Sequence, residues 1–161
     1  MYKIKKRVFL YGLLMFSVLA QVILMKRVAW FPDIILLMVV FAGIFRGGIE
    51  AAVLGLVAGL LRGLFSPETL PIDIFIFPAV GVISSVMTRM FYRQNPAAQI
   101  FTTTIAVTLV VALQTLYLNA TSGSDIGVHI VLLKSWKPIV VTVVISPFVF
   151  TFLKELLRLE E

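Results

Sequence analysis

The chain has 161 residues, of which 60% are hydrophobic and only 14% are charged. So few polar residues cannot cover a water-soluble globule of this size, and the long apolar runs therefore predict an all-α integral membrane protein. The net charge of +6 fits adhesion to anionic lipid better than nucleic-acid binding, for which no basic and aromatic face exists, while the absence of cysteine excludes thiol catalysis and disulfides.

Six apolar runs, each bounded by charged, proline, glycine or aromatic residues, are candidates for transmembrane helices. A span needs about 20 apolar residues, with a usual range of about 17 to 25. The predicted spans are residues 8–25, 30–45, 49–64, 72–90, 98–118 and 136–153. Nothing between them is long enough to form a core of its own, so we predict one transmembrane domain over residues 1–161.

The first run has two interpretations. A basic segment, residues 3–7, precedes an apolar stretch that ends in Val18-Leu19-Ala20, a sequence that signal peptidase would accept. The apolar run nevertheless continues through residues 22–25. We therefore favour an uncleaved signal anchor, which explains the same residues without the loss of a helix.

A very short turn joins the second and third runs. Only residues 46–48, Arg-Gly-Gly, separate them, which predicts a tight helical hairpin. Arg46 and Glu50 are four residues apart, a spacing that allows an ion pair if the geometry there is helical. The alternative is that each charge simply marks a helix end in the headgroup region.

Charged residues near the other end of the hairpin are predicted to meet. If the second run crosses the membrane in one direction and the third returns, Asp33 and Arg62 lie at the same height, and Asp73 follows at that height after the next turn. We therefore expect an Asp33–Arg62 or an Arg62–Asp73 pair, because an uncompensated charge in a bilayer is costly. Here too, marking a helix end in the headgroup region is the alternative.

The third run has small residues at every fourth position. They are Gly47, Ala51, Gly55, Gly59 and Gly63. In lipid no hydrophobic force drives helices together, so close approach of backbones along such a strip favours association. The strip drifts by about 40° at each step, so three or four of the five share one contact. Its neighbour is either another helix of this chain or a partner protein.

The distribution of lysine and arginine predicts the orientation, because basic loops stay in the cytoplasm. If the N-terminus is inside, nine of the 14 basic residues face the cytoplasm and five face outward. With six spans, both termini are then cytoplasmic.

Catalytic motifs are missing from the sequence. It has no HExxH, no Walker lysine loop and no GxSxG elbow, and its eight acidic residues are spread thinly. We therefore predict no enzyme activity, no cofactor and no metal site.

The central block, residues 31–82, resembles the family of the rod-shape-determining protein MreD. The ordered features that carry the resemblance are Pro32-Asp33 before a Leu/Ile run, Arg46-Gly47 at the turn, the Gly55/Gly59 helix, Leu64, Ser66, Leu70, Ile72 and Val80-Gly81. Outside this block, the other spans agree in number and length. The chain departs from the family at Gly63, where an Asp is common, and at Asp73, where Asn or His is usual.

The resemblance implies a non-catalytic subunit of the bacterial cell-elongation machinery in the inner membrane. It implies binding to the bitopic protein MreC, and action beside MreB, RodA and an elongation penicillin-binding protein in lateral peptidoglycan synthesis. It also implies a bundle similar to the S-components of energy-coupling-factor transporters. If the single span of MreC packs on this chain, the face of Ala51, Gly55, Gly59 and Gly63 is the first candidate.

Two other functions stay open on the sequence. A substrate-binding transporter subunit would need a polar cavity near the outer loops, for which Asp33, Arg62, Asp73, Trp136 and the threonines of residues 98–118 are candidates. A lipid-modifying enzyme would need acids clustered around a metal, and Asp33 and Asp73 would then be required for turnover.

Overall fold

A computed structural model describes residues 2–25, 32–90, 95–123, 130–131 and 136–157. In these ranges the chain forms helices and no strand, which confirms the predicted all-α class. The helices are α1 (Tyr2–Met25), α2 (Ile34–Phe45), α3 (Gly48–Phe65), α4 (Leu70–Met90), α5 (Pro96–Ser122) and α7 (Trp136–Leu156).

Four of the described helices are long and apolar enough to cross a membrane, namely α3, α4, α5 and α7. The apolar part of α1, Phe9–Gln21, is shorter, and so is α2. The 12 residues of α2 give a length of about 18 Å, against a hydrocarbon core of about 30 Å. Length and composition therefore support four of the six predicted spans.

Helix α2 is the central helix of the bundle. It begins at Ile34 because the side chain of Asp33 caps it, accepting a hydrogen bond of 3.1 Å from the backbone N–H of Leu36. The start predicted at residue 30 lies outside the described residues. Ten of its 12 residues, 35–44, are buried, and it contacts each of the other five helices. An all-apolar helix of this kind belongs in a protein core, where it does not have to match the thickness of the lipid.

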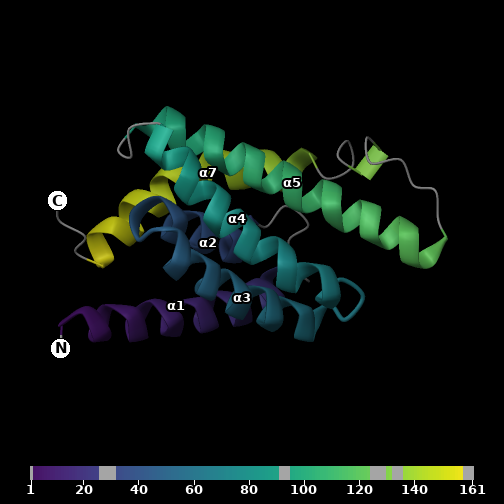
Figure 1. Ribbon diagram of the computed structural model, residues 1–161, viewed down its shortest axis with the longest axis horizontal. Helices are drawn as coiled ribbons and strands as arrows, with labels where there is room; N and C mark the ends of the chain where they lie inside the picture. Colours follow the sequence, from purple (N-terminus) through teal and green to yellow (C-terminus); the bar gives the residue numbers. More distant parts are fainter. Residues whose placement is uncertain (1, 26–31, 91–94, 124–129, 132–135, 158–161) are drawn as a thin grey trace.

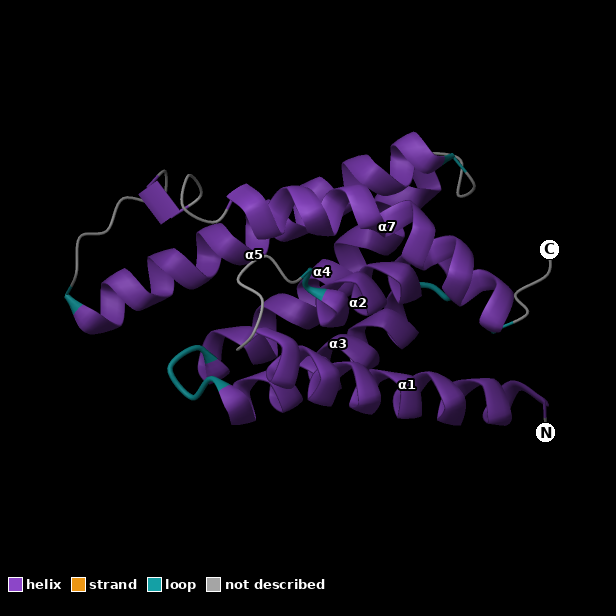
Figure 2. Ribbon diagram, turned by 180° about the vertical axis from the view of Figure 1, so that it is seen from behind, coloured by secondary structure: helices purple, strands orange, loops and turns teal. Residues whose placement is uncertain are grey.

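The helices alternate in direction. Figures 1 and 2 show α1 and α3 along one side of the molecule and α5 and α7 along the other, with α2 between them. The start of α1 and the end of α7 lie at the same end of the molecule (Figure 1). We call this end the terminal end. The end at which α1 stops and α2 starts is called the opposite end.

The small-residue strip of α3 packs against α4. A Cβ atom added to Gly55 would lie 2.5 Å from the carbonyl oxygen of Phe77, and one added to Gly59 would lie 2.5 Å from that of Asp73. These distances are far below normal contact, so the two backbones approach as closely as glycine allows. Among the described helices, α3 and α4 form the most extensively packed pair.

The same neighbour covers the rest of the strip. A Cβ on Gly63 would meet the side chain of Leu70, and the carbonyl oxygen of Ala51 would lie 2.7 Å from a Cβ on Gly81. Only Gly47 of the five predicted residues stands apart, with nothing within 4 Å of an added Cβ. The strip is therefore occupied by this chain's own α4, which leaves no room there for the span of a partner.

Candidate functional site

Six polar side chains meet at the opposite end of the bundle, one from each described helix or from the residue directly before it. We call them the polar cluster, and they are Gln21 of α1, Asp33 before α2, Arg62 of α3, Asp73 of α4, Gln114 of α5 and Thr142 of α7.

Asp33 connects three helices to the start of α2. Its carboxylate accepts a hydrogen bond of 3.2 Å from the side-chain amide of Gln21 and forms an ion pair with Arg62. Its backbone N–H donates to the hydroxyl of Thr142 over 3.0 Å. Gln21 also accepts a hydrogen bond from the N–H of Ile35, so its amide is used in both directions. The start of α2 is thus fixed by α1, α3 and α7.

Asp73 is fully buried and receives its hydrogen bonds from two other directions. The side-chain amide of Gln114 donates to Oδ1 over 2.6 Å, and the hydroxyl of Thr69 donates to Oδ2 over 2.9 Å. A buried carboxylate is tolerated only when such donors and a counter-charge replace the lost water. Gln114 therefore links α5 to α4 by the stronger, charge-assisted kind of hydrogen bond.

Arg62 stands between the two carboxylates. Its Nη1 pairs with Asp33, its Nε lies 3.9 Å from Oδ2 of Asp73, and its guanidinium lies 5.3 Å from the ring centre of Phe77. One guanidinium thus compensates two acids, and the remaining negative charge is shared among the neutral donors of the polar cluster. Both pairs expected from the sequence are present together.

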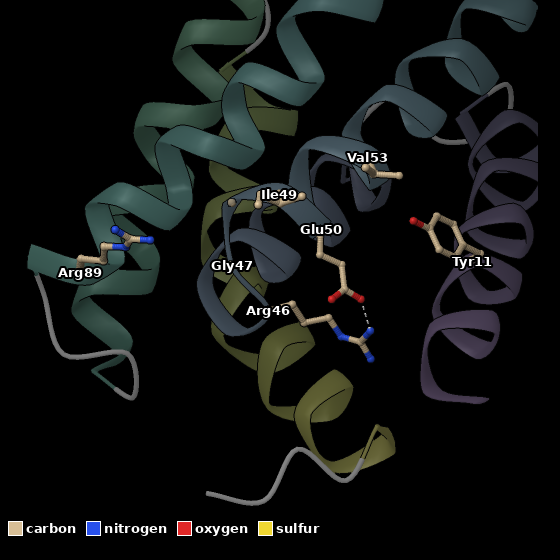
Figure 3. A pocket seen from close by; sticks show the side chains of 8 residues that line it. Tyr11, Arg46, Gly47, Ile49, Glu50, Val53 and Arg89 are labelled. Carbon is tan, nitrogen blue, oxygen red and sulfur yellow. Dashed lines mark hydrogen bonds and ion pairs between the residues drawn. The ribbon is translucent and has the colours of Figure 1, made fainter. Parts of the chain in front are cut away.

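The other predicted pair lies at the terminal end. Nη1 of Arg46 is 2.6 Å from Oε1 of Glu50, across the turn between α2 and α3, as Figure 3 shows. The side chain of Arg46 is only 7% exposed. This pair and the polar cluster are separated by the length of the hairpin, so the five predicted charged residues form two sites.

Three members of the polar cluster were not predicted from the sequence. Gln21, Gln114 and Thr142 were not among the predicted site residues. Their signal is that each is a hydrogen-bonding side chain inside an apolar run, which in lipid requires a partner from another helix. The sequence does not say which helix supplies that partner.

The arrangement is suited to holding helices together. The carboxylate oxygens of Asp33 and Asp73 accept hydrogen bonds from other members of the polar cluster and from two nearby donors, the N–H of Leu36 and the hydroxyl of Thr69, and both carboxylates pair with Arg62. In the described part of the chain, no three histidine or acidic side chains gather where they would hold a metal ion.

A family model for the rod shape-determining protein MreD matches residues 3–156. The chain belongs to the MreD family. This confirms the resemblance inferred from residues 31–82 and extends it over almost the whole chain. MreD proteins are bacterial membrane proteins with a role in determining rod shape, and they are not a known enzyme family.

No curated protein and no solved structure matches the chain significantly. The similarity to transporter S-components therefore stays a prediction. A cavity of about 600 Å³ lies at the terminal end, away from Asp33, Arg62 and Asp73, so nothing observed in the described residues supports the transport alternative.

Proposed function

We propose that this MreD-family chain is a non-catalytic scaffold subunit of the cell-elongation complex in the bacterial inner membrane. In this role it binds an MreC-type bitopic protein and helps to organise lateral peptidoglycan synthesis. The observation that carries the proposal is the family match over residues 3–156. MreB, RodA and an elongation penicillin-binding protein are the further members of the complex with which it would act.

The polar cluster supports a scaffold role because it links the six described helices to one another at one end. Hydrogen bonds that link helices within a membrane resist sliding and rotation, since a broken bond leaves a polar group in lipid. The central position of α2 adds contacts with every other helix. A partner's single span would therefore meet a surface that is already formed.

The proposed partner does not use the small-residue strip, because α4 covers it. Its span instead packs on the outward side of the bundle. Apolar side chains exposed there are abundant, and on α3 they include Leu56, Leu60 and Leu64.

Co-purification tests the proposed partnership directly. The wild-type chain, co-expressed with the MreC-type protein of the same organism and extracted in mild detergent, is expected to recover that protein in about equal amount. An unrelated bitopic protein with the same tag is the control for adhesion of apolar helices. Failure to recover MreC above this control, from well-folded material, would remove the proposed partner.

The orientation is tested separately by cysteine labelling, which is free of background because the chain has no cysteine. Single variants Lys3→Cys and Glu160→Cys are expected to resist a membrane-impermeant maleimide in intact spheroplasts and to react after lysis. This follows from the placement of the start of α1 and the end of α7 at one end of the molecule, together with the excess of basic residues there. Labelling of either site before lysis contradicts the cytoplasmic assignment.

A further inference from the structure

A cavity of about 600 Å³ opens at the terminal end, between α1, the turn from α2 to α3, and the last turn of α4 (Figure 3). The residues that line it are Tyr11, Arg46, Gly47, Gly48, Ile49, Glu50, Val53 and Arg89. It lies at one end of α3 and α4, which are long and apolar enough to cross a membrane. If they do cross it, the cavity is at the level where the lipid headgroups begin.

One part of the cavity is cationic. Arg46 is held by its ion pair with Glu50, which leaves the charge of Arg89 in excess. Arg89 is exposed, and no ion pair or hydrogen bond joins its side chain to any residue that the structure describes. The three charged side chains of the cavity sum to +1, and Arg89 is the donor available to a ligand.

The other part of the cavity is apolar. Ile49 is 86% exposed and Val53 is 50% exposed. In Figure 3 the ring of Tyr11, on α1, is directed toward the start of α3. Two exposed aliphatic side chains beside a guanidinium make a surface that suits an amphiphile better than a water-soluble anion.

The turn itself leaves room for the polar part of such a ligand. Gly47 has a φ of 102°, a conformation that favours glycine, and nothing lies within 4 Å of a Cβ placed there. The N-cap residue of α3, Gly47, has no side chain that could accept a hydrogen bond from the first N–H groups of the helix. These N–H groups carry a partial positive charge.

We propose that this cavity binds the phosphate group of an anionic phospholipid of the membrane, with the guanidinium of Arg89 on the phosphate and the start of the acyl chain along Ile49 and Val53. The proposal requires that α3 and α4 cross the bilayer. It does not depend on MreC binding, so it is tested independently of the proposed function.

Native mass spectrometry of the detergent-solubilised chain tests the site. The probes are phosphatidylglycerol, phosphatidylcholine and, as a soluble phosphate source, glycerol 3-phosphate. Wild type is expected to bind phosphatidylglycerol most tightly. Arg89→Gln is expected to weaken that binding about fivefold, the effect of one basic residue near an anionic surface. Phosphatidylcholine binding is expected to weaken less, because its choline cation already offsets the charge of the same phosphate group. Lys154→Gln removes the same charge on α7, outside the cavity, and is expected to stay within about twofold of wild type.

A second variant tests the apolar part without changing the charge. Val53→Trp fills the cavity from an exposed position and is expected to reduce phosphatidylglycerol binding by a similar factor. Equal losses in the Arg89 and Lys154 variants would overturn the site, because binding would then follow net charge alone. Binding of glycerol 3-phosphate as tight as that of phosphatidylglycerol would overturn the lipid assignment. So would an Arg89→Gln protein that binds phosphatidylglycerol as wild type does but no longer recovers MreC. That result would indicate that the cavity binds an acidic protein segment.

Discussion

Replacement of Arg62 by methionine is expected to destabilise the protein by about 3 kcal/mol. The substitution keeps a long side chain in α3 but removes the only guanidinium between Asp33 and Asp73 in the described polar cluster. Asp73 is 0% exposed, so its carboxylate would keep its neutral donors and lose its counter-charge. Breaking a buried ion pair costs about 3 to 5 kcal/mol, and the lower value applies because Arg62 and Asp33 are each about one-fifth exposed.

The melting temperature of the purified protein in detergent measures this effect. Lys154→Met is the matched control, because it removes one positive charge from α7 outside the polar cluster and is expected to change stability by less than about 0.5 kcal/mol. Adding Asp33→Asn and Asp73→Asn to the Arg62 variant should restore at least half of the loss, since both carboxylates become neutral and Asn still caps α2. A triple variant as unstable as the single one would show that charge is not the cause.

The sequence predicted the heights of these residues in the membrane but not their neighbours around the bundle. Counting residues along alternating spans places Asp33, Arg62 and Asp73 at one height, and adjacent helices of a hairpin must then lie close together. Gln114 and Thr142 belong to helices far along the chain. Their approach to Asp73 and Asp33 depends on the order of helices around α2. Apolar side chains of similar size do not specify that order.

Two other features lie beyond the apolar pattern for related reasons. A run of about 12 apolar residues has the same sequence pattern whether lipid or protein surrounds it. The central burial of α2 was therefore not predicted. The strip on α3 predicts a close neighbour for Gly55 and Gly59, but small residues make a flat surface that specifies no particular helix. The cavity near Arg89 was missed because it depends on how far α1 and α4 stand from the turn.

The variants Gly55→Leu and Gly59→Leu, made separately, are expected to prevent the formation of a stable fold. Each added side chain would start about 2.5 Å from a backbone carbonyl oxygen of α4, which cannot move aside as a flexible side chain would. Overpacking of a core costs about 1 to 3 kcal/mol where side chains can adjust, and here α3 and α4 must separate. Even Gly55→Ala is therefore expected to cost about 3 kcal/mol. Size-exclusion profiles and melting temperatures in detergent measure the loss.

Gly12→Leu on α1 is the control that separates this mechanism from a general effect of bulk. Gly12 is also a helical glycine, but it is exposed and nothing lies within 4 Å of an added Cβ, so the folded fraction should match wild type. MreC recovery then distinguishes the two roles of the strip on α3. If the strip only joins α3 to α4, the Gly55 and Gly59 variants lose MreC in proportion to the folded protein that they lose. A Gly55→Leu protein that folds and melts like wild type, yet no longer recovers MreC, would show that the partner and not α4 occupies this face in the membrane.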